Sequence, residues 1–332
     1  MTRRGERVAA ALADQIELPP DKSRVLRRAV RLEWLSLAFL VTAVLAMYVA
    51  LGSSQAMKAA WIEDLLSFLP PIAFLITNRI RAKEPTGDHP FGFHRSVSVG
   101  YLVSASALLT MGTYLVVESA LGLVAAEHTP IGLVTAFGST FWAGWLMIAA
   151  LAYTLVPPVL LGRAKLGPAR DLHDKVLYAD AAMNKADWQT AAAGIVGVLG
   201  IGLGLWWLDG VAAILIGASV SHDGWTNLRT ALSDLMDSRA SVFDDRTTIH
   251  PAVAGVRDAV RADPGVDAVQ VRIREEGHVF HAEVFVVPAT AAPLGDADLE
   301  RIRDTVRAVD WKLHHVVVAP VRELPVGNLP VP

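Results

Sequence analysis

The sequence has no cysteine, which excludes disulfides, thiolate metal sites and cysteine nucleophiles. Charge is also scarce. Charged residues make up 19% of the 332 residues, against about 25% in an average globular chain. Residues 1–31 are polar and basic, without an apolar core and cleavage site, so we do not expect a secretory signal. With 53% hydrophobic residues and a mean hydropathy of +0.39, the composition indicates a membrane protein.

Several sequence signals of other protein classes are missing. No nucleophile–base pair, phosphate-binding loop or HExxH motif appears, so we do not expect an enzyme, and nothing predicts a cofactor. The net charge is only −3, and no basic stripe interleaved with aromatic residues is present. We therefore expect no nucleic-acid partner.

Long apolar runs predict how the chain is divided. A run of about 20 apolar residues can cross the hydrocarbon core of a bilayer. We expect a cytoplasmic arm at 1–30 and a transmembrane domain at 31–235, with a cytoplasmic domain at 238–332. The six expected helices lie at about 32–51, 57–80, 96–117, 131–161, 178–208 and 210–228. This predicts a membrane all-α six-helix domain, which makes the lipid bilayer one partner.

Basic residues predict the orientation of these helices. They cluster before the first helix, between the second and third, and between the fourth and fifth. The second and third clusters are Arg79, Arg81, Lys83 and Arg95, and then Arg163, Lys165, Arg170 and Lys175. The intervening loops hold only Lys58. Because basic loops remain in the cytoplasm, we expect a multi-pass protein of the cell (inner or plasma) membrane with both termini cytoplasmic.

The composition changes after Asp234 to charged, alternating segments. Helical spacing at 249–262 and 299–309, with strand alternation at 269–274, 278–287 and 312–321, predicts a small α+β domain of order αββαβ. Alternation should send His314 and His315 to opposite sheet faces, so that they could not bind one metal together. We expect this domain to be metal-free and to make the protein a homodimer.

Acidic residues within the apolar runs are the candidate site. Asp180, Asn184 and Asp187 share one helix face, with Met183 on the same side. Asp187 lies ~18 Å from the cytoplasmic end of its helix, and Asp64 lies ~21 Å from that end of the second helix. Two carboxylates at matching depth are tolerable if a divalent cation or protons compensate them. Asp180, nearer the entrance, has the alternative role of solvating or capping the helix start.

These residues carry a resemblance to the cation diffusion facilitator family. The matching stretches are Tyr178-Ala-Asp-Ala, Asp88-His89-Pro-Phe-Gly92, Asp209 at the start of the sixth helix, and the αββαβ tail. The resemblance implies a six-helix, proton-coupled exporter of zinc and related divalent metals. It also implies that two ligands from helix 2 and two from helix 5 bind the metal, each pair spaced four residues apart.

The chain keeps this ligand pattern only in part. Asp64 and Asp187 fit, but Phe68 and Met183 stand at the other two ligand positions. Replacement ligands could be Glu63, Asn184 and Asp180, or Met183 itself through its thioether, although methionine more often serves packing. Lys185 also lies close to Asp187, and we expect it to pair with Glu63 of helix 2.

The resemblance implies further metal ligands outside the membrane. In the loop between helices 2 and 3, Asp88 and His89 fit a second metal site, with Phe93 at the second histidine position and His94 displaced by one. The alternative is that this segment is a structured basic loop that binds no metal. In the tail, His281 fits a ligand position on a strand.

We therefore expect efflux of a divalent cation of the zinc, iron, manganese or cobalt class, by proton antiport. The alternative is a non-transporting membrane scaffold or metal sensor that kept the fold and lost the full metal site.

Overall fold

The computed structural model describes residues 18–50, 61, 64–126, 132–136, 139–243, 245–290 and 293–325. The chain divides into two compact units. One, Asp21–Lys83 with Ser96–Leu232, is mainly helical; the other combines Glu84–Arg95 with the described residues from Ser233 on and holds a small sheet. The protein is thus mostly helical, with a small sheet domain at its C-terminal end.

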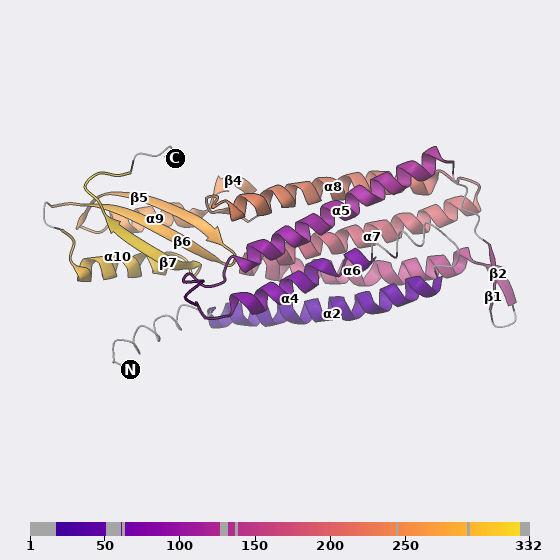
Figure 1. The fold of residues 1–332 in the computed structure, drawn as a ribbon, viewed down its shortest axis with the longest axis horizontal. Coiled ribbons are helices and arrows are strands. Elements are labelled where there is room, and N and C mark those ends of the chain that lie inside the picture. Colours follow the sequence, from indigo (N-terminus) through magenta and orange to yellow (C-terminus); the bar gives the residue numbers. More distant parts are fainter. Residues whose placement is uncertain are drawn as a thin grey trace. The chain divides into compact units, whose positions relative to one another are not determined.

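The helical unit consists of long helices that run side by side (Figure 1). They are α2 (Pro20–Ala50), α4 (Leu69–Arg81), α5 (Ser96–Val124), α6 (Gly144–Leu172), α7 (Lys175–Gly202) and α8 (Leu208–Leu235). Among the described residues, Pro20–Val49, Ser96–Val124 and Gly144–Leu172 are long and apolar enough to cross a membrane. The last two helices are more polar, but their 28 residues each give about 42 Å of helix.

Two helix starts differ from the sequence prediction. α2 begins at Pro20 rather than near Leu32, so the last part of the expected arm is continuous with the first span. Proline is favourable in the first helical turn. The helix expected from Ile131 begins only at Gly144. Before it, β1 (Leu133–Ala136) and β2 (Ser139–Trp142) form an antiparallel hairpin of β-branched and aromatic residues. α6 also continues through Pro157-Pro158 to Leu172.

Glycines allow α5 and α8 to approach closely. A Cβ added to Gly112 of α5 would lie 2.5 Å from the backbone nitrogen of Ser221 of α8. A Cβ added to Gly224 of α8 would lie 2.6 Å from Cα of Leu109. Small residues at such contacts let membrane helices pack by backbone proximity.

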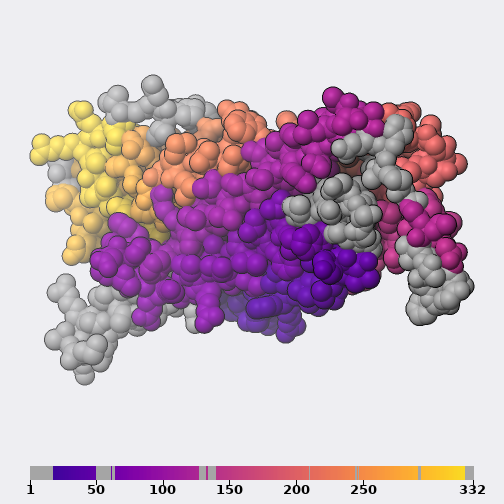
Figure 2. Space-filling model, turned by 45° about the vertical axis from the view of Figure 1, so that its right-hand side comes forward, coloured from indigo at the N-terminus to yellow at the C-terminus, as the bar shows by residue number. Residues whose placement is uncertain are grey.

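The outer surface of α2 from Trp34 on, and of α4 up to Ile76, is mostly apolar. Their side chains cover neighbouring parts of one face of the molecule (Figure 2), and they include Trp34, Leu45, Tyr48, Val49 and Ile76, all more than half exposed. An apolar surface of this extent is typical of contact with lipid.

The sheet unit has the predicted αββαβ order. α9 (Pro251–Arg261) and α10 (Asp296–Val309) accompany β5 (Val266–Glu276), β6 (Val279–Pro288) and β7 (Leu313–Pro320). β5 pairs antiparallel with β6, and β6 pairs parallel with β7 across the α10 crossover. A small hairpin of β3 (Ser241–Val242) and β4 (Asp245–Ile249), which the sequence did not predict, precedes α9.

The core of this unit lies between the sheet and its two helices. Val256 of α9 and Val306 of α10 pack with Phe280 and Val284 of β6, and all four are fully buried. Because strand side chains alternate, His281 and Glu283 of β6 belong to the other face of the sheet.

A bulge at the start of β7 overturns one prediction. Phe280 pairs with Leu313, but the next residue of β6, His281, pairs with His315, so His314 is an extra residue in the ladder. An extra residue interrupts side-chain alternation. The rings of His314 and His315 are therefore neighbours, with centroids 5.7 Å apart, and not separated by the sheet.

Candidate metal site

Asp187 lies in the interior of α7. The helix begins at Lys175, where the Asp174 side chain caps it by accepting a 3.0 Å hydrogen bond from the Leu177 amide. The Ser67 hydroxyl donates a 2.7 Å hydrogen bond to Oδ1 of Asp187. Ser67 stands in the turn between the helical residues 64–66 and α4. This bond ties the segment that carries Asp64 to the middle of α7.

Asp64 has a carboxylate oxygen that no described residue satisfies. Its Oδ2 is buried and makes no hydrogen bond to any described residue. The Asp64 and Asp187 carboxylates also interact electrostatically. Buried oxygens of this kind are costly unless a cation, a proton or water satisfies them. The two acids therefore present carboxylate oxygens that a cation, protons or water would have to satisfy.

Asn184 and Met183 occupy different surroundings. The Asn184 amide donates a 2.8 Å hydrogen bond to the Asp180 carbonyl of its own helix. Met183 is 1% exposed and packs in an apolar cluster with Leu108 and Met111 of α5. The structure thus gives Met183 the packing surroundings that were the alternative to a thioether ligand.

Asp180 belongs to a buried ion cluster. Lys165 of α6 forms an ion pair with Asp180 and a second one, of 3.2 Å, with Oε2 of Glu33 on α2. All three side chains are at most 2% exposed. Asp180 is therefore engaged by an ammonium group, and Asp174, not Asp180, caps the helix start.

This cluster corrects the interpretation of Lys165 as a loop residue. It lies within α6 and is fully buried, because two carboxylates from other helices compensate its charge. Neither Glu33 nor Lys165 was a candidate from the sequence. The available signal was Glu33, the single charged residue in the otherwise apolar run 32–51.

Lys185 has a partner that sequence reasoning missed. Its ammonium lies 3.6 Å from Oδ2 of Asp223 on α8, and both side chains are partly exposed. Glu63, its predicted partner and a candidate ligand, lies outside the described residues.

The candidate ligands of the second metal site do not all come together in the structure. Asp88 and His89 are exposed, and the His89 ring stacks on Phe93 at 4.5 Å. His94 instead approaches His314 and His315, with ring centroids 5.7 and 5.5 Å away. His281 lies on the outer sheet face, 6.0 Å from the His315 ring.

Comparisons with known proteins agree with a transport role. The family described as "Cation efflux transmembrane domain" matches residues 33–236. The chain is 21% identical to the manganese efflux system protein MneS of Bacillus subtilis over 293 residues, covering 86% of this chain and 93% of MneS. It is 23% identical to the magnetosome protein MamB of Magnetospirillum gryphiswaldense over 64% of this chain and 78% of MamB. Metal tolerance protein 7 of rice, Oryza sativa subsp. japonica, is 28% identical over 49% of this chain and 39% of its own length.

Proposed function

Because the chain belongs to the cation diffusion facilitator family of metal cation efflux transporters, we propose that it exports a divalent cation in exchange for protons. Members of this family are membrane transporters and not enzymes, and the metal is their substrate. The observation that carries the proposal is the pair Asp64 and Asp187. Ser67, three residues after Asp64, donates a hydrogen bond to Asp187, and no described residue satisfies the buried Oδ2 of Asp64.

Proton exchange follows from the ligand chemistry. A carboxylate must be deprotonated to bind a metal, so the cation and protons compete for the same oxygens. A cation that enters from the cytoplasm would displace protons from Asp64 and Asp187. Protons that enter from the opposite side would then favour its release.

The donor atoms favour manganese as the cargo. The two carboxylates are hard oxygen donors, and Asn184 can add a carbonyl oxygen. Oxygen donors suit manganese, whereas imidazole and thiolate donors suit zinc. The similarity to a manganese efflux protein points to the same metal.

We place six spanning helices in the membrane, with both termini in the cytoplasm. The basic clusters favour this orientation, and α7 and α8 are long enough to join the three most apolar helices. The sixth would be the helix expected at 57–80, which includes most of α4 and of which residues 57–60, 62 and 63 lie outside the described part of the chain. Residues 31–235 would then form the transport domain and residues 238–332 a cytoplasmic dimerisation domain, behind the arm at 1–30.

Reconstituted protein tests the activity. In proteoliposomes that contain a pH-sensitive dye, Mn²⁺ should move and drive an opposite proton flux, with smaller responses to Zn²⁺, Co²⁺, Fe²⁺ and Cd²⁺. Protein-free vesicles and vesicles carrying Asp64→Asn are the controls. If none of these metals produced a proton flux, and the protein remained folded, the transport proposal would be ruled out.

One observation favours the non-transporting scaffold or metal sensor. Met183 stands at a usual ligand position yet is packed among apolar side chains of α5. The site would then have fewer ligands than the four-ligand pattern of the family and would bind a metal less tightly. The absence of flux in the same assay would support this alternative.

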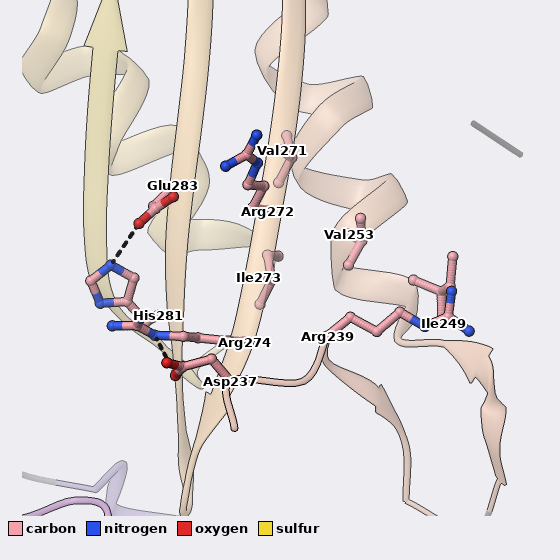
Figure 3. Close-up of a pocket in the computed structure, with 10 residues that line it drawn as sticks. All are labelled: Asp237, Arg239, Ile249, Val253, Val271, Arg272, Ile273, Arg274, His281 and Glu283. Carbon is pink, nitrogen blue, oxygen red and sulfur yellow. Dashed lines mark ion pairs between the residues drawn. The ribbon is translucent and has the colours of Figure 1, made fainter. Parts of the chain in front are cut away.

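The sheet unit would supply the contact of a homodimer. A groove of about 370 Å³ runs along the edge strand β5 (Figure 3). Its lining carries both signs of charge, with Arg272 and Arg274 beside Asp237 and Glu283, and dashed lines mark the Arg274–Asp237 and His281–Glu283 pairs. A surface with both signs can complement a second copy of itself across a two-fold axis.

Charge reversal in this groove tests the dimer. Arg272→Glu should lower the dimer fraction in native mass spectrometry of detergent-solubilised protein, because it places like charges at the proposed contact. Arg303→Glu, on α10, which contributes no residue to the groove lining, should leave the fraction unchanged. Only monomers in the unaltered protein would contradict the proposal.

A further inference from the structure

Three histidines converge in the sheet unit. His94 comes from the segment before α5, and His314 and His315 come from the bulge of β7. Within the described part of the chain, one nitrogen from each lies within 4.8 Å of the other two. The three ring-centroid distances are 5.5, 5.7 and 5.7 Å, so the rings form a nearly regular triangle.

We propose that His94, His314 and His315 form a binding site for a zinc-class divalent cation. Three imidazoles are a ligand set that Zn²⁺ accepts, leaving a fourth position for water or another ligand. At Zn–N distances of 2.0–2.1 Å, each nitrogen needs to move by less than about 1 Å from the observed triangle. Small side-chain rotations are sufficient for such a movement.

The rings are prepared for ligation. Nδ1 of His314 and Nε2 of His315 are buried and make no hydrogen bond to any residue that the structure describes. Imidazole nitrogens that make no hydrogen bond can offer their lone pairs to a metal.

The segment that carries His94 is held in place. Gly92 adopts φ +78°, a left-handed conformation that favours glycine, two residues before His94. Arg95 forms an ion pair with Asp237 and donates a 3.2 Å hydrogen bond to the Leu235 carbonyl. The Arg95 guanidinium also lies 4.0 Å from Glu276. The site is therefore largely formed before any metal binds, which lowers the entropic cost of ordering its ligands.

The surrounding charges do not exclude a dication. Arg95, Arg274 and Arg307 lie nearby, and Asp237 and Glu276 pair with the first two. His281 is a candidate for the fourth position, because its ring lies 6.0 Å from that of His315 and its Nδ1 is buried without a hydrogen-bond partner among the described residues.

This site differs in chemistry from the proposed transport site. Nitrogen donors prefer zinc-class metals, whereas the carboxylates in the helical unit are oxygen donors that suit manganese. One protein would thus bind two different metals at two different places. A metal at the histidines would bind the Glu84–Arg95 segment, which connects α4 to α5 along the chain, to β7.

The test uses the full chain with both transport carboxylates neutralised, as Asp64→Asn with Asp187→Asn. After treatment with a chelator, this protein in detergent should bind one Zn²⁺ per chain. It should also bind Co²⁺ with the visible absorption bands of tetrahedral coordination. Because the carboxylates are absent, the result does not depend on the transport proposal.

Single changes assign the ligands. His94→Ala, His314→Ala and His315→Ala should each weaken Zn²⁺ binding by at least about tenfold, the lower limit for loss of even an outer-shell partner. His89→Ala, a histidine of the same segment, should have no effect. His314→Gln provides a second variant if His314→Ala does not fold, and it should also lose the Co²⁺ bands.

Zinc should also slow amide hydrogen exchange in residues 84–95 of the parent protein but not of His314→Ala. Equal Zn²⁺ affinity in the parent and the three histidine variants would overturn the proposal. So would weaker Zn²⁺ binding in His89→Ala with unchanged binding in His94→Ala.

Discussion

Asp187→Asn should reduce metal-driven proton flux by at least about 100-fold, the upper end for the loss of an outer-shell partner of a metal site. Asparagine keeps the volume of the side chain and can still accept a hydrogen bond from Ser67. It removes the negative charge that attracts a dication and the group that exchanges a proton. The measurement is Mn²⁺-dependent acidification or alkalinisation of proteoliposomes, with dimer content and thermal unfolding as checks on folding.

Ser67→Ala is the matched control for this change. It removes the hydroxyl that orients the Asp187 carboxylate and leaves the charge, so the flux should fall by a smaller factor, about 10-fold to 100-fold. Unchanged flux in well-folded Asp187→Asn would rule out Asp187 as the metal ligand.

Lys165→Ala should destabilise the helical unit by about 3–5 kcal/mol, the usual cost of removing one partner from a buried ion pair. The change leaves Glu33 and Asp180 fully buried without the ammonium that compensates them. The triple variant Lys165→Met, Glu33→Gln, Asp180→Asn should lose much less, because it leaves no uncompensated charge. Thermal unfolding in mild detergent gives the comparison.

Arg163→Ala, an exposed basic residue on the same helix, should change stability by no more than about 0.5 kcal/mol. A triple variant as unstable as Lys165→Ala would show that the cluster contributes through packing and not through charge compensation.

The sequence predicted the features that depend on local pattern. Apolar runs located the long helices, and alternation located the strands of the tail. Helical rise alone placed Asp64 and Asp187 at one depth, and the Ser67 hydrogen bond joins their segments in the structure. These predictions needed only the period of each element and its direction.

The features that were missed depend on contacts between distant residues. Glu33 and Lys165 are 132 positions apart, and a lysine near other basic residues resembles a cytoplasmic loop residue. Asp223 became the partner of Lys185 only through the packing of α7 and α8. The hairpin before α6 was hidden because a short apolar run is compatible with either helix or strand.

The cluster of His94, His314 and His315 depends on the number of residues in β7 as well as on their types, because β7 contains one extra residue. In a strand of regular period, two adjacent histidines cannot share a face, whichever residues surround them. Deleting His314 would therefore restore a regular ladder, keep His281 opposite His315 and leave the rest of β7 in register. Building the same cluster of three histidines on another sheet would likewise require an inserted residue, because substitutions alone do not change the two-residue alternation of side chains along a strand.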